Sequence, residues 1–344
     1  MNWIDREDSD YEQFAATFDP QRYDRQARRS RKPKVKHVPK KSPEDIVREL
    51  ADVGALEGEK SFQTTYQPSR YEAGWLLESL HDFYRNEFIT DVLAQVRGGK
   101  EASVYRCAAR PVHGVDLLAA KVYRPRKFRQ LRNDKMYREG RAVLTAGGEE
   151  IKENEQRVMR ALGKKTAFGV QVEQTSWLMY EFTTLQTLHA AGAAVPKPFA
   201  VAENAILMGY IGDADTAAPT LNTVKLQPAE ARRLFTKTLN NVELMLNHHM
   251  IHGDLSAYNI LYWDGDITLI DFPQVTNSQG NSQAYFILER DVERICAYFA
   301  EQGVRSAEEP SHLTAQLWKQ YVEGDPREKA ADLSRLLEQS EEEV

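Results

Sequence analysis

The stretch "IHGDLSAYNILYWDGDITLIDF", residues 251–272, decides how this chain is interpreted. His252, Asp254 and Asn259 stand among short apolar runs that are typical of strands, and Asp271 directly follows the apolar run 267–270. A carboxylate that is buried without a partner costs several kcal/mol or shifts its pKa. The pattern therefore predicts that Asp271 is buried against a compensating cation.

A metal ion is the cation that the spacing favours. A hairpin of residues 260–263 and 267–270 around "DGD" would bring Asp271 back beside Asn259. An amide oxygen and a carboxylate would then converge where Mg²⁺, or alternatively Mn²⁺, binds together with nucleotide phosphates and water. Asp254 is left to orient or deprotonate an attacking hydroxyl or water.

Length and composition restrict the class of protein. The chain has 344 residues and 42% hydrophobic content, enough for one large domain or two lobes with a shared cleft. Two cysteines make neither a disulfide framework nor a zinc site. The start "MNWIDREDSD" lacks the apolar segment of a secretory signal, and no run approaches the roughly 18 apolar residues of a membrane helix. We expect a soluble, cytoplasmic protein with no membrane partner.

Charge is spread unevenly along the chain. Residues 22–41, "RYDRQARRSRKPKVKHVPKK", hold ten Lys or Arg and one Asp, so this segment carries +9 and, with the whole chain at −6, the remainder carries −15. A basic block on an acidic body favours contact with a phosphate polyanion such as ribosomal RNA. A solvated tail or a nuclear-import signal would have the same composition.

The chain is expected to divide into a strand-rich half and a helical half. Strands are predicted near 92–97, 102–108 and 116–123, and on both sides of a turn at 203–204; helices are predicted at 42–50, 71–94, 176–191 and 228–248, with two or three more after 284. The predicted divisions are a basic, largely disordered tail (1–41), an N-terminal helical extension (42–94), a strand-rich lobe with a partly mobile insertion (95–211, insertion 124–176), a helical lobe (212–305), and C-terminal helices with an acidic tail (306–344).

The opening stretch resembles the protein-kinase-like superfamily, because His-x-Asp-x-x-x-x-Asn followed by Ile-Asp-Phe is its catalytic and metal-binding arrangement. "HGDLSAYN" is similar to the RIO family of atypical kinases in particular. Ordinary eukaryotic-type kinases have Arg where Gly253 stands, and aminoglycoside or choline phosphotransferases usually have His where Ser256 stands. The resemblance implies an α+β, bilobal, protein-kinase-like (RIO) fold with a small β-rich N-lobe and a mainly helical C-lobe.

A second stretch, "VRGGKEASVY" at 96–105, resembles the RIO nucleotide loop. Gly98 and Gly99 let backbone amides approach phosphates, Lys100 follows them, and Ser103 is expected to donate its hydroxyl. Lys121 in "AAKVY" would reach the α- and β-phosphates of ATP. Taken alone, Gly98 and Gly99 favour a plain hairpin turn, and their spacing from "AAKVY" is what favours the nucleotide loop. For Lys121, a strand lysine that extends to solvent is the alternative.

Two further stretches complete the resemblance. "WLMYEF" at 177–182 resembles a RIO helix whose glutamate aligns with Glu181, so an ion pair of Lys121 with Glu181 is predicted and Glu173 is the alternative partner. "ILMGYIG" at 206–212 matches the hinge of kinases. Met208 would back the adenine pocket, and the Gly209 carbonyl and Ile211 amide would bind its edge. An internal strand is the alternative.

The resemblance implies a serine/threonine protein kinase or ATPase that uses ATP and Mg²⁺. Autophosphorylation on serine, an aspartyl-phosphate on Asp271, and a role in maturation of the small ribosomal subunit come with it. Only 20 residues separate Asp271 from Asp291, which would buttress the catalytic loop, so no long peptide-docking segment is expected. The protein acceptor is unknown. A small-molecule phosphotransferase and an ATP-switched binding protein remain as alternatives.

Overall fold

The structure is a computed structural model that describes residues 64–99, 101–124, 136–137, 139–152, 155–164, 166–304 and 309–323. The basic segment 22–41, the helix predicted at 42–50, Lys100 and the acidic C-terminal residues therefore lie outside the described residues. The chain divides into two units between residues 52 and 53, and every described residue belongs to the second, residues 53–344. All that follows concerns the second unit.

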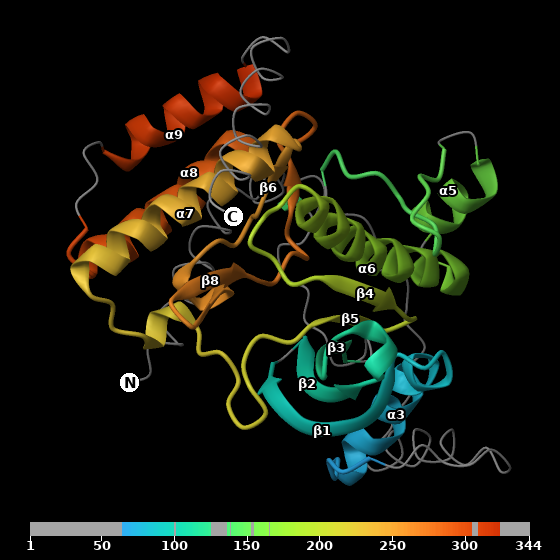
Figure 1. Cartoon of the computed structure of the whole chain (residues 1–344). Helices are drawn as coiled ribbons and strands as arrows, with labels where there is room; N and C mark the ends of the chain where they lie inside the picture. Colours follow the sequence, from blue (N-terminus) through green and yellow to red (C-terminus); the bar gives the residue numbers. More distant parts are fainter. Residues whose placement is uncertain are drawn as a thin grey trace, which may run out of the picture. The chain divides into compact units, whose positions relative to one another are not determined.

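A five-stranded antiparallel sheet forms the first lobe (Figure 1). Its spatial order is β1-β2-β3-β5-β4. The strands are β1 (Ile89–Gly98), β2 (Ala102–Ala109), β3 (Leu117–Tyr123), β4 (Pro198–Val201) and β5 (Ala205–Gly209). A short 3-10 helix, η3 (Pro111–His113), lies between β2 and β3.

Each face of this sheet packs against one helix. On β3, Leu118, Ala120 and Val122 belong to a core cluster with the helix α3 (Arg70–Arg85). The alternate residues Ala119 and Tyr123 belong to the main core, which includes the helix α6 (Ala167–Ala190). Successive side chains of a strand point to opposite faces, so Lys121 lies on the α6 side. A small helix, α5 (Gln156–Gly163), precedes α6.

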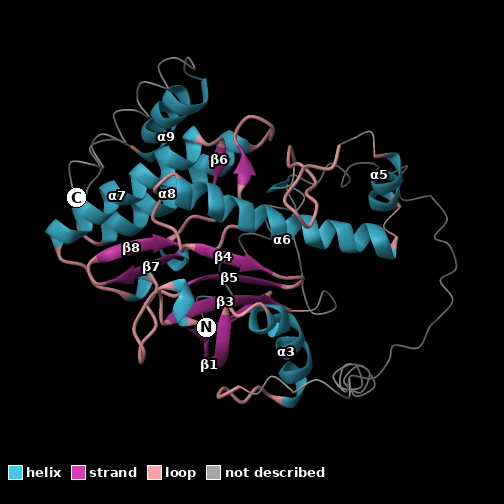
Figure 2. Cartoon of the chain, turned by 45° about the vertical axis from the view of Figure 1, so that its right-hand side comes forward, coloured by secondary structure: helices cyan, strands magenta, loops and turns pink. Residues whose placement is uncertain are grey.

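The second lobe is mainly helical (Figure 2). Its helices are α7 (Pro228–Asn247), α8 (Ala284–Glu301) and α9 (Pro310–Trp318), followed by a π-helical turn η7 (Lys319–Glu323), and η5 (Leu221–Thr223) precedes α7. The helix predicted at 228–248 forms as α7, which buries one face and has Pro228 in its first turn. Its buried residues are Ala231, Leu234, Thr238, Asn241, Val242, Met245 and Leu246.

Two small hairpin-like pairs carry the opening stretch of sequence. β7 (Ile260–Trp263) pairs with β8 (Asp266–Leu269), and β6 (Met250–Ile251) pairs with β9 (Thr276–Asn277). The short helix η6 (Ala257–Asn259) lies directly before β7. The strands and the turn between them agree closely with the hairpin that the sequence predicted.

Two boundaries differ from the sequence-based expectation. The helix predicted at 71–94 ends at Arg85, and the chain enters β1 at Ile89, because Ile89 and Val92 are buried in the core of the sheet. The helix predicted from 176 begins at Ala167, where the Thr166 hydroxyl caps it by accepting from the Gly169 N–H at 3.1 Å. The first half of α6 was not predicted because it contains a Gly and several β-branched residues, which have low helix propensity.

The architecture is the bilobal α+β arrangement that was predicted: a small sheet lobe and a mainly helical lobe joined by residues 210–227. None of the described helices is both long enough and apolar enough to cross a membrane.

Candidate active site

Lys121 is the centre of a buried charged network between the lobes. Its Nζ lies 2.6 Å from Glu181 Oε1 and 2.6 Å from Asp271 Oδ1. The Lys121 side chain is 11% exposed and the Glu181 side chain 1%. Burial by itself would lower the pKa of Lys121, but the Asp271 and Glu181 carboxylates raise it well above its ordinary value. The predicted ion pair with Glu181 is confirmed, and the alternative partner, Glu173, lies two turns earlier on α6.

Tyr123 holds the other oxygen of Glu181, a contact that the sequence reasoning missed. Its hydroxyl donates to Glu181 Oε2, and its ring meets the Trp177 ring edge-on at a centroid distance of 4.6 Å. Tyr123 follows Lys121 by two residues on β3, so both side chains point to α6. This spacing is the signal that would have identified it.

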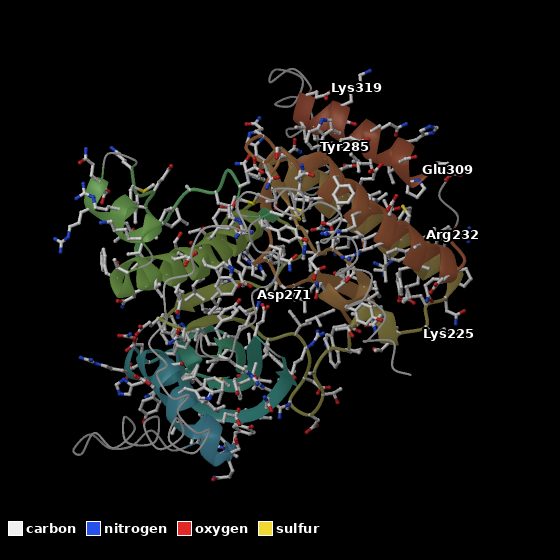
Figure 3. The ribbon with its side chains drawn as sticks, turned by 180° about the vertical axis from the view of Figure 1, so that it is seen from behind. Lys225, Arg232, Asp271, Tyr285, Glu309 and Lys319 are labelled. Atoms are coloured by element: carbon white, nitrogen blue, oxygen red, sulfur yellow. The ribbon has the colours of Figure 1, made fainter. Side chains whose placement is uncertain are left out.

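The sequence predicted that Asp271 is buried, and this prediction is wrong. Its side chain is 44% exposed, and it lies between the sheet and the helices (Figure 3). Its backbone is left-handed, with φ at 72°, which Asp tolerates better than most residues. Partial desolvation would raise its pKa, but the ion pair with Lys121 lowers it below the ordinary value. The cation that compensates the Asp271 carboxylate in this structure is therefore Lys121.

The β7–β8 hairpin brings Asn259 next to Asp271. The Ile270 N–H donates to the Asn259 carbonyl at 2.9 Å. The Asn259 Nδ2 donates to Asp254 twice, to its carbonyl at 2.8 Å and to its Oδ2 at 3.0 Å. The amide nitrogen thus faces Asp254, and among the described residues no hydrogen bond uses the Asn259 Oδ1.

These residues fit a magnesium ion better than a metal held by protein alone. Within the described residues, no three His, Cys, Asp or Glu side chains gather so as to hold a metal ion. One amide oxygen and one carboxylate, from Asn259 and Asp271, leave most positions to phosphate oxygens and water, which Mg²⁺ prefers when it binds with a nucleotide.

Asp254 pairs with an arginine that the sequence reasoning missed. The Arg294 Nη1 lies 2.8 Å from Asp254 Oδ1, and the two side chains are 32% and 36% exposed. Arg294 follows Asp291 by three residues on α8, and residues three apart lie on the same face of a helix. The helix face that carries Asp291 to the catalytic loop therefore carries Arg294 as well.

Two side chains of α8 hold the loop that carries Asp254. The buried Asp291 accepts from the Gly253 N–H at 2.8 Å, and the neighbouring Arg290 donates to the Gly253 carbonyl. Gly253 has φ at +83°, and a Cβ added there would lie 2.3 Å from the Gln274 carbonyl oxygen. Only glycine fits this position, which explains why Arg, found here in ordinary kinases, is absent. Burial raises the pKa of Asp291 to about 7.

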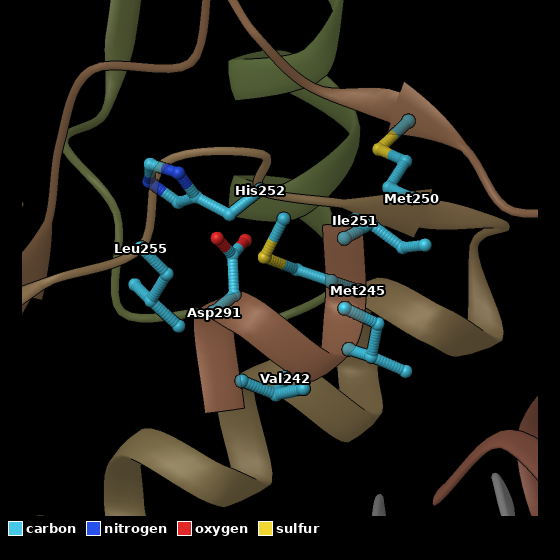
Figure 4. A pocket seen from close by; sticks show the side chains of 8 residues that line it. Val242, Met245, Met250, Ile251, His252, Leu255 and Asp291 are labelled. Atoms are coloured by element: carbon cyan, nitrogen blue, oxygen red, sulfur yellow. The ribbon is translucent and has the colours of Figure 1, made fainter. Parts of the chain in front are cut away.

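His252 orients the loop without lining the cleft. It is buried, its Nε2 lies 3.2 Å from the Ile270 carbonyl, and its Nδ1 accepts from the Asp254 N–H at 3.3 Å. These partners fit the neutral ring, and burial lowers its pKa. Beneath it lies a cavity of about 10 Å³, lined mainly by apolar side chains and by Asp291 (Figure 4). Such a cavity holds one water at most, so it is not a substrate site.

The predicted nucleotide loop forms the turn between β1 and β2. Gly98 pairs with Ser103, and the Gly99 N–H donates to the Ala102 carbonyl at 2.9 Å. The expected role of the Ser103 hydroxyl is wrong. Ser103 is 1% exposed and shares its face of β2 with Tyr105, on the α3 side of the sheet and away from Lys121.

The predicted hinge follows β5. Met208 is buried on the α6 side of the sheet, where it pairs with Ala119, and this is the face that Lys121 occupies. The Gly209 N–H donates to the Lys197 carbonyl at 2.8 Å, and the Ile211 carbonyl accepts from the Ala218 N–H at 3.0 Å. The contacts of Gly209 and Ile211 with adenine stay a prediction.

Part of the predicted insertion is tied to both lobes. We call residues 139–152 the crossing segment. Arg141 donates to the Pro273 carbonyl at 2.8 Å, two residues after Asp271. The Leu144 N–H donates to the Ser176 Oγ on α6 at 2.9 Å. The segment therefore connects α6 directly to the chain that follows the candidate metal ligand.

A family model described as "RIO domain" matches residues 104–312, which is more than half of the chain. This chain belongs to the RIO family. It is 30% identical over 210 residues to the RIO-type serine/threonine-protein kinase Rio1 of Haloferax volcanii, covering 60% of this chain and 62% of that protein. It is 29% identical over 229 residues to the serine/threonine-protein kinase RIO1 of Chaetomium thermophilum, covering 63% of this chain and 40% of that protein.

The chain thus matches less than two thirds of the length of both RIO relatives. Among solved structures, a Rio2 kinase–ADP/Mg²⁺–phosphoaspartate complex from Chaetomium thermophilum is similar, with a TM-score of 0.48 and 17% identity, covering 88% of this chain and 86% of that one.

Proposed function

We propose that this RIO protein is an ATP- and Mg²⁺-dependent phosphotransferase that acts on serine or threonine hydroxyls. The observation that carries the proposal is the position of Lys121 Nζ, which lies 2.6 Å from a carboxylate on each side. The names of its relatives as serine/threonine-protein kinases agree with it.

ATP would bind in the cleft on the α6 side of the sheet. Met208 would form part of the adenine wall, and the amides near Gly98 and Gly99 would face the phosphates. Lys121 would exchange Asp271 for a phosphate oxygen while keeping Glu181. When bound at Asn259 and Asp271, the metal ion would neutralise phosphate charge.

Asp254 would position the acceptor hydroxyl for transfer. The acceptor oxygen forms a bond to the γ-phosphorus while the bond from that phosphorus to the β,γ-bridging oxygen breaks, and ADP leaves. The hydroxyl proton passes to an Asp254 oxygen. Asn259 would keep the Asp254 side chain in place during this step, since it binds both its carbonyl and its Oδ2.

Slow ATP hydrolysis is the second candidate activity, because the Asp271 carboxylate is itself exposed to the cleft. In that reaction an Asp271 oxygen attacks the γ-phosphorus, ADP leaves, and water then hydrolyses the aspartyl-phosphate to release phosphate. Autophosphorylation on serine is part of the same proposal.

Nucleotide binding and turnover by the purified protein test the proposal. Mg²⁺-dependent release of ADP, and labelling of a protein acceptor from γ-labelled ATP, are expected. Asp271→Asn should abolish both, whereas Asp254→Ala should abolish labelling and spare nucleotide binding. Undiminished turnover by Asp271→Asn would contradict the metal and phosphate assignment.

A ribosomal partner is also proposed, on the basic segment 22–41 alone. Ten cationic side chains within 20 residues suit the phosphates of rRNA. A cytoplasmic location would be consistent with such a partner.

A further inference from the structure

Asp254 has one secure partner and one exchangeable partner. The first is Asn259, which is 7% exposed and binds Asp254 at two atoms. The second is Arg294, whose contact with Asp254 Oδ1 involves two side chains that are each about one third exposed. Solvent, and therefore an acceptor molecule, reaches the Arg294–Asp254 pair.

Arg294 has unused binding capacity. A guanidinium has five N–H donors in a planar fork, and it binds carboxylates and phosphates bidentately. Among the described residues, its hydrogen bonds amount to the single one from Nη1 to Asp254. The remaining donors lie next to the carboxylate that would receive the hydroxyl proton.

A second guanidinium approaches the same loop from the other lobe. The exposed Arg97, at the end of β1, donates from Nη1 to the Tyr258 carbonyl at 3.4 Å. Tyr258 directly precedes Asn259, so Arg97 on β1 and Arg294 on α8 both contact the loop that carries Asp254 and Asn259. An acceptor that carries negative charge beside its hydroxyl would meet complementary charge here.

We propose that Arg294 makes this site select a serine that is followed closely by acidic residues. The serine hydroxyl would bind an Asp254 oxygen, and a carboxylate one to three residues later would bind the free donors of Arg294. In an extended peptide each residue adds about 3.3 Å, so such a carboxylate reaches a neighbouring donor without strain. This proposal rests on the proposed transfer to serine.

The chain itself contains a sequence of this kind. Ser340 is followed by Glu341, Glu342 and Glu343. A synthetic peptide with the sequence of residues 335–344, "RLLEQSEEEV", is therefore the acidic probe, and "RLLEQSQQQV" is its neutral counterpart. Each has one serine, so the site of labelling is unambiguous.

The experiment compares kcat/KM for labelling of the two peptides from γ-labelled ATP by the full chain. We expect the acidic peptide to be preferred at least about tenfold, the factor that one charge-assisted contact of about 1.4 kcal/mol supplies. Arg294→Gln should reduce the preference to about twofold, mainly through a higher KM for the acidic peptide, and Arg294→Lys should retain part of it.

Arg232→Gln is the matched control, because it removes an exposed arginine on α7 that lies far from Asp271 (Figure 3). It should leave the preference unchanged. The affinity for the Mg²⁺ complex of a non-hydrolysable ATP analogue should be equal in all variants.

Three results would overturn the proposal: equal use of both peptides, an undiminished preference in Arg294→Gln, or labelling of neither peptide by a protein that binds and hydrolyses ATP. Each of these leaves the nucleotide site intact. A protein that binds no nucleotide at all would instead refute the proposed function on which this one rests.

Discussion

Lys121 and Asp271, 150 residues apart in sequence, form a direct ion pair between the two lobes, with Nζ and Oδ1 separated by 2.6 Å. The residue proposed to bind phosphate and the residue proposed to bind the metal ion thus neutralise each other in this structure. Under the proposed function, Mg–ATP would replace this ion pair, whereas the more buried pair of Lys121 with Glu181 would persist. The first prediction tests that division.

Replacing Lys121 should weaken both folding and nucleotide binding. Lys121→Met leaves the buried Glu181 carboxylate without its cation, which costs about 3 kcal/mol of unfolding free energy. Adding Glu181→Gln should restore most of that stability without restoring nucleotide affinity. Urea unfolding and nucleotide titration of the single and double variants measure the two effects. Normal ATP turnover by Lys121→Met would remove this residue from the site.

Tyr123→Phe should reduce nucleotide affinity through Glu181. The ring keeps its contact with Trp177, but one buried Glu181 oxygen loses its donor, at a cost of about 1–3 kcal/mol. Tyr262→Phe is the control, because Tyr262 also donates to a glutamate, Glu230, at 2.6 Å but lies on β7. We expect a raised KM for ATP in the first variant alone. Equal KM values would show that the Tyr123 hydroxyl has no part in positioning Glu181.

Gly253→Ala should distort the catalytic loop. The new Cβ would meet the Gln274 carbonyl oxygen at 2.3 Å, in addition to the strain of φ at +83°. Gly303→Ala is a matched control, since Gly303 has the same φ and no atom within 4 Å of an added Cβ. The control should lose about 1 kcal/mol, and Gly253→Ala at least about 2 kcal/mol more, with a loss of transfer activity. If thermal unfolding gave equal losses of unfolding free energy for Gly253→Ala and Gly303→Ala, the close contact of the added Cβ with Gln274 would be ruled out.

Asp291 should make stability depend on pH. Its pKa is about 7 when folded, against about 4 in an unfolded chain. Between these values the unfolded chain releases a proton that the folded protein keeps, so the free energy of unfolding falls as pH rises and levels off above about 7. Three pKa units at about 1.36 kcal/mol each give an expected total fall of about 4 kcal/mol.

Asp291→Asn removes this titration but keeps an oxygen for the Gly253 N–H. The buried His252 has a lowered pKa, so its titration makes the free energy of unfolding rise with pH, opposite to the effect of Asp291. His252 is present in both proteins, as are the charged groups near Asp291, which are Arg290, Arg294 and Asp254. Urea unfolding between about pH 5 and pH 8 should therefore give a flatter profile for the variant. If the profiles of unfolding free energy against pH were superimposable for the two proteins, the raised pKa of Asp291 would be contradicted.

Deleting residues 1–41 should weaken RNA binding and flatten its salt dependence. Each lost phosphate contact on single-stranded RNA lowers the slope of log K against log salt by about 0.7. A full-length variant with the ten Lys and Arg of 22–41 changed to Gln separates charge from length. If the slope of log K against log salt were unchanged in both variants, residues 22–41 would be a solvated tail that does not bind RNA.

Much of the site could be predicted because it depends on short-range spacing. The seven residues between Asn259 and Ile267 allow one tight hairpin, and this hairpin fixes Asp271 beside Asn259 whatever surrounds it. The Lys121–Glu181 pair followed from motifs whose strand and helix both formed as expected.

The features of the site that were not predicted depend on which surfaces pack together in the folded protein. A single sequence does not determine that packing directly. The exposure of Asp271 depends on how the two lobes meet, and the face that Ser103 occupies is covered by α3, whose packing on the far side of the sheet was not predicted. Arg294 lies 40 residues from Asp254, and only the docking of α8 under the catalytic loop brings the two together.

The crossing segment has a mechanical consequence. The lobes are joined at residues 210–227, after β5, and again through the contact of Arg141 with Pro273. Separation of the lobes therefore has to break the Arg141–Pro273 hydrogen bond as well as the Lys121–Asp271 ion pair, so the crossing segment adds resistance to that movement.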